Sequence, residues 1–109
     1  MIFITGPLFS GKRACAKALL HCDDAALAHY AVWEVQDQAA GCPDLAALAD
    51  RLARDYQVVI ATEVGGGVVP IDAQERAARE AAGRLACLLA ARATRVVRVF
   101  CGIPVTIKG

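Results

Sequence analysis

The most chemically specific stretch of the sequence is a glycine-bounded loop near its amino terminus. It follows the pattern G-x-x-x-x-G-K and reads Gly6-Pro7-Leu8-Phe9-Ser10-Gly11-Lys12. A glycine at its start lets successive backbone N–H groups converge on one point, and a helix that begins at its end adds a positive dipole. Lys12 can reach the outer phosphates of a nucleotide. The spacing therefore predicts a phosphate-binding loop, with an ordinary strand-to-helix turn as the alternative.

One position beside this loop departs from the usual motif. A serine or threonine normally follows the lysine and gives Mg²⁺ a hydroxyl ligand, but this chain has Arg13. A guanidinium cannot ligate a cation. Either Arg13 faces solvent while the nucleotide and water hold the metal, or Arg13 contacts phosphate itself. We therefore expect Mg²⁺ to come with the nucleotide and assign no residue of the chain as a metal ligand.

A second group of candidate residues follows an apolar run in the middle of the chain. Glu63 comes directly after that run, and three glycines come two residues later. In an open α/β sheet, ligands collect at the carboxyl ends of strands, where a carboxylate can order a metal-bound water or accept a hydroxyl proton. We assign Lys12 and Glu63 as catalytic, although Glu63 could simply cap the strand end. The residues assigned to nucleotide binding are Gly6, Pro7, Leu8, Phe9, Ser10, Gly11, Lys12, Arg13, Gly65, Gly66 and Gly67.

The hydrophobic pattern predicts the elements that must position these residues. Apolar runs predict strands over residues 1–5 and 57–62, and a weaker one over 30–35. We also expect a strand over 95–100 and, after a turn at 102–104, an antiparallel edge strand over 105–108. Periodic apolar residues predict helices over 12–22, from Pro43 and Asp44 onward, and over 72–92, where Asp72 and Glu75 match a capping box. Strands that alternate with helices predict an open, mostly parallel α/β sheet flanked by helices, with a single domain over residues 1–109.

Composition and charge exclude several classes of function. The 109 residues include twelve basic and eleven acidic side chains, and no basic stripe is visible, so we expect no nucleic-acid partner. No apolar run is long enough to span a membrane, and the start of the sequence lacks the basic residues of a signal peptide. The five cysteines form no metal-binding or disulfide pattern. We therefore expect reduced thiols and a cytoplasmic protein.

Three separated motifs point to a known family. They are EVGGGVVP at residues 63–70, AGRL at 82–85 and GIPVTIK at 102–108. With the amino-terminal strand and loop, they follow the order found in the adenosylcobinamide kinase/adenosylcobinamide-phosphate guanylyltransferase family of cobalamin biosynthesis. The sequence resembles this family over roughly residues 1–20 and 57–108. The resemblance implies a P-loop NTPase-like fold, binding of ATP or GTP, phosphoryl transfer to the aminopropanol hydroxyl of cobinamide, and assembly into homo-oligomers, commonly trimers.

The resemblance also carries roles onto particular residues. It gives the phosphate-loop role to Gly6, Gly11 and Lys12, and it places Glu63 and the glycines at 65–67 beside the active site. The chain is much shorter than the family between the two loops, where the family carries a HHxxRP motif whose histidine takes the guanylyl group. His21 and His29 do not lie in such a motif. The sequence therefore favours the kinase over the guanylyltransferase activity.

Two further departures concern substrate contacts. The family's TNEVG reads ATEVG at residues 61–65, and the asparagine expected after Arg84 and Leu85 is Ala86. Our leading hypothesis is a shortened cobinamide kinase that takes a nucleoside triphosphate and a corrinoid substrate. The alternative is a non-catalytic nucleotide- or phosphate-binding module derived from the family, and a third hypothesis is an α/β interaction protein with an empty loop.

Overall fold

Five strands form one sheet in the order β2-β3-β1-β4-β5. The computed structural model describes residues 1–64 and 72–109, and its strands are β1 (Ile2–Gly6), β2 (Ala31–Val32), β3 (Val58–Thr62), β4 (Arg95–Phe100) and β5 (Ile103–Lys108). The strands β2, β3, β1 and β4 run parallel, whereas β5 pairs antiparallel with β4. The predicted fold class, a mostly parallel P-loop-like sheet with an antiparallel edge, is confirmed.

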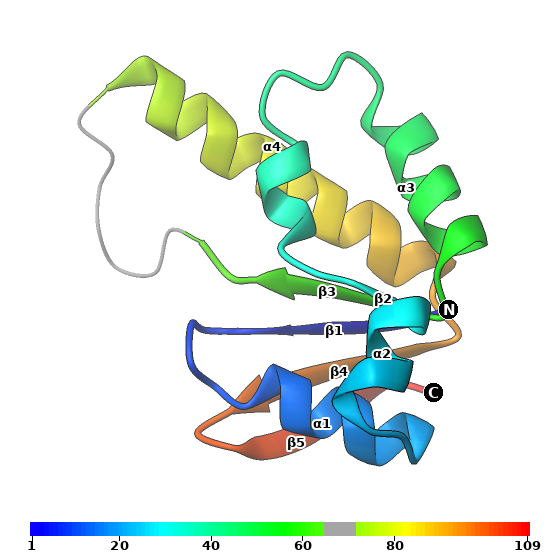
Figure 1. Cartoon of the computed structure of the whole chain (residues 1–109). Coiled ribbons are helices and arrows are strands. Elements are labelled where there is room, and N and C mark those ends of the chain that lie inside the picture. The colour runs from blue at the N-terminus through cyan, green and yellow to red at the C-terminus, as the bar shows by residue number, and fades with distance from the viewer. Residues whose placement is uncertain (65–71) are drawn as a thin grey trace.

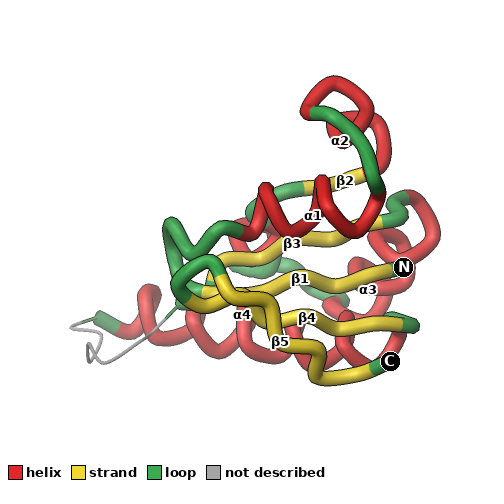
Figure 2. Tube along the Cα trace, turned by 90° about the horizontal axis from the view of Figure 1, so that it is seen from below, coloured by secondary structure: helices red, strands yellow, loops and turns green. Residues whose placement is uncertain are grey.

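Helices cover both faces of the sheet (Figures 1 and 2). They are α1 (Lys12–Leu20), α2 (Asp24–Tyr30), α3 (Leu45–Asp55) and α4 (Ala73–Arg92), together with a short 3-10 helix, η1 (Val35–Gln38). The helices α1 and α2 lie on one face, and α3, α4 and η1 lie on the other (Figure 1). Because β3 is covered from both sides, all five of its residues are buried, as its continuous apolar run predicts.

The core has two layers, one on each face of the sheet. Neighbouring residues of β1 alternate between them: Phe3 packs toward α3 and α4, and Ile4 packs toward α1 and α2. Leu85 and Leu89 of α4 are buried against the first layer. Each buried leucine contributes about 1.5–3 kcal/mol relative to an exposed one. This packing holds the central strands, whose carboxyl ends carry the site.

The predicted helix starts at Asp44 and Asp72 are confirmed as N-caps. An Asp44 carboxylate oxygen accepts a hydrogen bond from the Ala47 N–H at 3.0 Å, and Asp72 accepts one from the Glu75 N–H at 2.7 Å. Pro43 lies before the cap of α3, so its predicted place in the first turn is wrong. The proline instead precedes the helix, where its missing N–H removes no helical hydrogen bond.

The segment between α1 and α3 differs most from the prediction. The first helix ends at Leu20 rather than residue 22, because His21 takes the left-handed conformation at φ 51°. The helix α2 was not predicted; its Asp23 cap accepts a hydrogen bond from the Ala26 N–H at 2.9 Å. The strand expected over 30–35 shrinks to β2, since Glu34 has φ 53° and turns the chain into η1.

The carboxyl-terminal hairpin has a tighter turn than expected. Phe100 pairs directly with Ile103, so only Cys101 and Gly102 form the turn, both with positive φ. The edge strand therefore begins two residues earlier than predicted, and all six of its residues are exposed. None of the helices in the described parts of the chain has the length and apolar character needed to cross a membrane.

Candidate phosphate-binding site

The predicted phosphate loop joins β1 to α1 at the carboxyl edge of the sheet (Figure 1). A Cβ on Gly6 would lie 2.3 Å from the Val99 carbonyl oxygen and 2.8 Å from Ser10 Oγ, so only glycine fits there. Gly11 has φ +97°, which favours glycine, and a Cβ on it would lie 3.3 Å from Gly102 Cα. The backbone of the loop is therefore packed closely against the end of β4 and the hairpin turn.

Ser10 supplies a buried hydroxyl inside this loop. The residue is 4% exposed, and its Oγ has no hydrogen-bond partner among the described residues. Its carbonyl oxygen accepts a hydrogen bond from the Gly102 N–H at 2.8 Å, which braces the loop against the hairpin turn. Buried hydroxyls are nearly always paired. An unpaired one in a tight glycine loop is consistent with a loop that receives an acceptor such as a phosphate oxygen.

Lys12 folds back over the loop from the start of α1. Its side chain is buried, and its ammonium donates to the Pro7 carbonyl oxygen at 2.7 Å and to the Gly6 carbonyl oxygen at 3.3 Å. An ammonium has three donors, so one remains for a ligand. The N-cap of α1 is Gly11, which offers no side-chain hydrogen bond to the first turn. The positive end of α1 and the Lys12 ammonium therefore act at the same loop.

Glu63 lies beside this loop, as predicted. Its N–H donates to the Gly6 carbonyl oxygen at 2.9 Å, and the same oxygen accepts from Lys12 Nζ. The two residues assigned as catalytic thus meet at one backbone carbonyl. The predicted glycines at 65–67 lie outside the described residues.

The side chain of Glu63 forms an ion pair with Arg98 of β4, which the sequence analysis missed. Arg98 Nε lies 2.6 Å from Glu63 Oε1, and Nη2 lies 2.9 Å from Oε2. These hydrogen bonds lower the pKa of Glu63; partial burial opposes them, and the charges of Arg98 and Lys12 add to the lowering. The same contacts raise the pKa of Arg98. A charged residue among the valines of β4 was the available signal.

A second polar group at the same edge was also missed. Thr62 Oγ1 donates to Glu34 Oε1 at 2.8 Å, and Gln36 Nε2 donates to Glu34 Oε2 at 2.7 Å. The Thr62 N–H donates to Gln36 Oε1 at 3.0 Å. Thr62 is the register partner of Gly6, so this cluster lies one strand away from the loop. The neutral donors of Thr62 and Gln36 thus fix the orientation of the Glu34 carboxylate, which follows the end of β2.

The Arg13 side chain is largely exposed to solvent, as the first of its two predicted arrangements expects. Its guanidinium carbon lies 5.0 Å from the centre of the Trp33 ring, and Nη1 lies 3.8 Å from an Asp24 carboxylate oxygen. The side chain is 65% exposed. These contacts lie toward α2, and they leave the position after Lys12 without a metal ligand.

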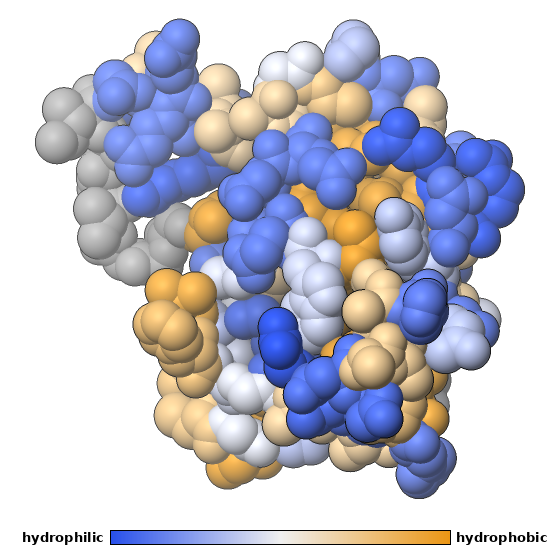
Figure 3. All heavy atoms as spheres, in the orientation of Figure 1, coloured by the Kyte–Doolittle hydropathy of each residue, from blue (hydrophilic) through white to orange (hydrophobic). Residues whose placement is uncertain are grey.

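The remaining predicted loop residues contribute backbone and exposed apolar surface. The Pro7 carbonyl accepts from Lys12, as described, whereas Leu8 and Phe9 are 63% and 94% exposed. Phe9 also has φ 58°, which is unusual for an aromatic residue. Apolar atoms gather around the loop and the β4–β5 hairpin at the lower left of Figure 3.

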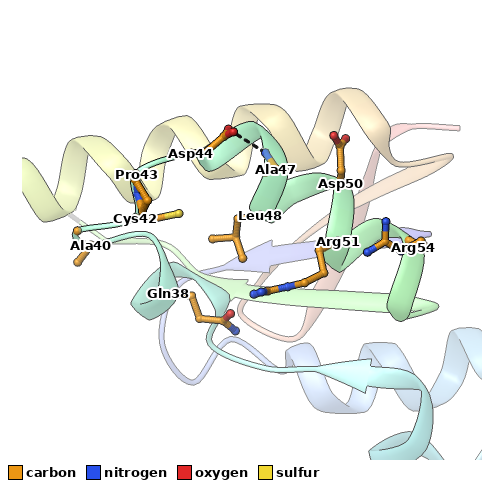
Figure 4. Close-up of a pocket in the computed structure, with 11 residues that line it drawn as sticks. Gln38, Ala40, Cys42, Pro43, Asp44, Ala47, Leu48, Asp50, Arg51 and Arg54 are labelled. Carbon is orange, nitrogen blue, oxygen red and sulfur yellow. Dashed lines mark hydrogen bonds between the residues drawn. The ribbon is translucent and has the colours of Figure 1, made fainter.

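A separate hollow lies beside α3 (Figure 4). Its wall includes Asp44, whose carboxylate caps α3 at the Ala47 N–H. None of the residues of the phosphate loop lines it, and neither does Glu63. The hollow is therefore not part of the candidate site.

Among the described residues, no group of three or more His, Cys, Asp or Glu side chains is placed to hold a metal ion.

The parallel sheet, the glycine loop after β1 and the helix that starts at Lys12 define a P-loop-like α/β fold. A family model described as "Cobinamide kinase / cobinamide phosphate guanyltransferase" matches residues 35–107 of the chain. The chain belongs to this family, whose members are nucleotide-using transferases of cobinamide in cobalamin biosynthesis. A search of curated proteins finds no match.

The matched range differs from the expected one. The resemblance was expected over 1–20 and 57–108, but the match also takes in η1 and α3 and begins after the phosphate loop. Glu63 and Arg98 both lie within it, whereas Lys12 does not. The family match therefore does not cover the phosphate loop, and the support for phosphate binding there is the geometry of the loop itself.

Proposed function

We propose that the chain transfers the terminal phosphate of ATP or GTP to the aminopropanol hydroxyl of adenosylcobinamide. The observation that carries the proposal is the placement of Lys12: a buried ammonium over a tight glycine loop, at the positive end of a helix. Phosphoryl transfer needs little covalent chemistry from the protein, because positioning and electrostatic stabilisation supply most of the acceleration. Family membership supports the corrinoid substrate.

In this mechanism the loop stabilises charge on the transferred phosphoryl group. The backbone N–H groups, the end of α1 and the free donor of Lys12 face the phosphate oxygens. The acceptor oxygen forms its bond to phosphorus as the bond to the bridging oxygen breaks, and the nucleoside diphosphate leaves. Glu63 lies beside Gly6, where it can position the acceptor.

Mg²⁺ belongs to the proposal as a partner of the nucleotide. The position after Lys12 offers no ligand, because a guanidinium cannot bind a cation; Arg13 contacts Trp33 and Asp24 instead. The Glu34 carboxylate fits the metal better: it lies at the carboxyl edge of the sheet, and Thr62 and Gln36 already fix its orientation. One carboxylate with phosphate and water ligands is an ordinary arrangement for Mg²⁺, which neutralises phosphate charge when bound.

We leave guanylyl transfer out of the proposal. His21 caps the carboxyl end of α1, and His29 lies in the last turn of α2. Both are exposed and belong to helix ends away from Lys12, which begins α1. These positions give no support to guanylyl transfer through either histidine.

A kinase assay tests the proposal directly. Adenosylcobinamide is incubated with ATP or GTP labelled at the terminal phosphate, and labelled adenosylcobinamide phosphate is measured. We expect Lys12→Ala to lower kcat by about 100-fold, as for loss of one donor to a transition-state oxyanion. Lys17→Ala, on the same helix, serves as the matched control and should keep full activity. Absence of product from the wild-type protein with both nucleotides would reject the kinase.

A non-catalytic nucleotide-binding module is the second candidate. The arginine in place of the hydroxyl residue after Lys12 favours it, since the loop then offers Mg²⁺ no ligand. Isothermal titration calorimetry separates the two proposals. Nucleotide binding that depends on Lys12, without turnover in the presence of adenosylcobinamide, would favour the module.

We also propose that residues 1–109 act as one nucleotide-binding domain and that the chain assembles with copies of itself. All the described helices pack on a single sheet, which supports the first proposal. The outer strand β5 pairs on one side only and is exposed along its length, which supports the second. A trimer, as the family resemblance implies, is one such assembly.

A further inference from the structure

The ion pair between Glu63 and Arg98 crosses the end of β1. Glu63 follows β3 and Arg98 lies on β4, and β1 runs between these two strands. Arg98 is the register partner of Thr5, the residue before the phosphate loop. Two parallel hydrogen bonds, of 2.6 Å and 2.9 Å, fix the plane of the carboxylate as well as its position. Glu63 is thus held in one orientation beside the first glycine of the loop.

Arg98 is itself held by rigid surroundings. Its guanidinium carbon lies 5.5 Å from the centre of the Phe100 ring, on the same side of β4. The strand pairs with β1 on one side and with β5 on the other. A side chain on a central strand, with contacts on two sides, places its partner more reproducibly than a loop residue does.

Folding stability gives little reason for this arrangement. The side chains of Arg98 and Glu63 are 43% and 34% exposed, and ion pairs that water reaches add little to stability. Arg98 also interrupts an apolar strand whose next residue, Val99, is fully buried. The pair lies at the carboxyl edge of a parallel sheet, where ligands bind in this class of fold.

We propose that Arg98 is a positioning residue, which holds the Glu63 carboxylate so that it orients the acceptor hydroxyl of the substrate toward the terminal phosphate. This inference rests on the proposed kinase activity. Both carboxylate oxygens are engaged by the guanidinium, but each keeps a lone pair for a further hydrogen bond. Glu63 accepts that bond from the acceptor hydroxyl; the hydroxyl oxygen then attacks phosphorus, and its proton is lost to water.

The charge state of Glu63 agrees with this role. The Arg98 hydrogen bonds lower the pKa of the carboxyl group, which therefore stays ionised in mildly acidic solution. A carboxylate with a lowered pKa is a weak proton acceptor but a good hydrogen-bond acceptor. Orientation of the hydroxyl, rather than removal of its proton, is the task that suits it.

Two substitutions at Arg98 separate charge from geometry. Arg98→Met removes the charge, and Arg98→Lys keeps it but cannot form two parallel bonds. Steady-state phosphorylation of adenosylcobinamide is measured across pH for both variants. We expect Arg98→Met to lower kcat by about 10- to 100-fold with little change in KM for the nucleotide, and Arg98→Lys to recover part of the loss. The acid limb of the pH profile should move to higher pH in Arg98→Met, because the pKa of Glu63 is no longer lowered. Arg54→Met is the matched control, because Arg54 pairs with its sequence neighbour Asp55 at the end of α3.

A double substitution shows whether Arg98 acts through Glu63. If it does, Arg98→Met adds no further loss of kcat to Glu63→Gln. An additional loss in the double variant would mean that Arg98 contacts the substrate itself, and it would overturn the positioning role. Circular dichroism of each variant checks that the fold is kept.

Nuclear magnetic resonance gives a readout that does not depend on turnover. The side-chain carboxyl carbon of Glu63 is titrated with pH in the wild-type, Arg98→Met and Arg54→Met proteins. We expect the midpoint to rise only in Arg98→Met; an unchanged midpoint would overturn the inference. Turnover that survives Arg98→Met intact would also overturn it, while leaving the kinase in place. Absence of turnover in the wild type would instead reject the kinase, and the acceptor role with it.

Discussion

Gly6 and Gly83 differ in the space around them, and the same substitution should therefore have opposite effects at the two residues. A Cβ on Gly6 would lie 2.3 Å from the Val99 carbonyl oxygen, so the backbone must shift. A Cβ on Gly83, in the middle of α4, meets nothing within 4 Å. We expect Gly6→Ala to lower the free energy of unfolding by more than about 1 kcal/mol and Gly83→Ala to raise it by about 0.5–1 kcal/mol. Urea unfolding measures both changes, and a Gly6→Ala protein as stable as wild type would contradict the close packing of the loop.

The candidate site was only partly predictable at the scale of residues. The geometry of the loop is local: consecutive residues carry its spacing, and the flanking strand and helix follow from their own apolar patterns. Arg98 lies 35 residues from Glu63, with β1 between them in the sheet. Glu34 and Thr62 are 28 residues apart. Such pairs depend on strand order and register, which no short pattern in the sequence specifies.

Helix α4 is the longest helix among the described residues, and it carries Leu85 and Leu89 into the core. The stability of its first turn therefore matters for the whole fold. Asp72 caps that turn with a hydrogen bond of 2.7 Å from the Glu75 N–H. We expect Asp72→Ala to lower the free energy of unfolding by about 1 kcal/mol, whereas Asp72→Asn keeps a capping oxygen and should cost far less. Thermal and urea unfolding of the two variants measure the difference. Equal losses would show that the negative charge at the helix end, rather than the cap, is what matters.

Elements with strong local signals were predicted well, and those fixed by tertiary contacts were not. The strands β1 and β3 are continuous apolar runs, which are typical of a sheet covered on both faces, and β4 is rich in valine. The run over 30–35 looks similar, yet Val35 is fully buried in η1 rather than in a strand. Its apolar side chain joins the core beneath α4, and the left-handed Glu34 redirects the chain. The apolar pattern indicates that Val35 is buried, but it does not indicate whether Val35 lies in a strand or in a helix.

At the scale of the whole molecule, the edge strand β5 is exposed along its length. All six residues of β5 are exposed, and Ile103, Val105 and Ile107 are each more than half exposed. Leu8 and Phe9 of the phosphate loop and Phe100 of β4 add further exposed apolar area (Figure 3). A strand with a free edge and apolar side chains is a template for pairing with another chain. Self-association through this edge would cover it and bring a second copy near the phosphate loop.

Sedimentation equilibrium tests this assembly, because the chain alone has a mass of 11.4 kDa. We expect the wild-type protein to sediment as a multiple of that mass and Val105→Lys to shift it toward the monomer, since a lysine on a pairing edge opposes association. Ala28→Lys is the matched control: Ala28 is also exposed, but it lies on α2, at the opposite side of the sheet from β5. A wild-type mass of one chain would refute the assembly. A multiple that Val105→Lys leaves unchanged would place the contact on another surface, and in that case the exposed strand would need a different explanation.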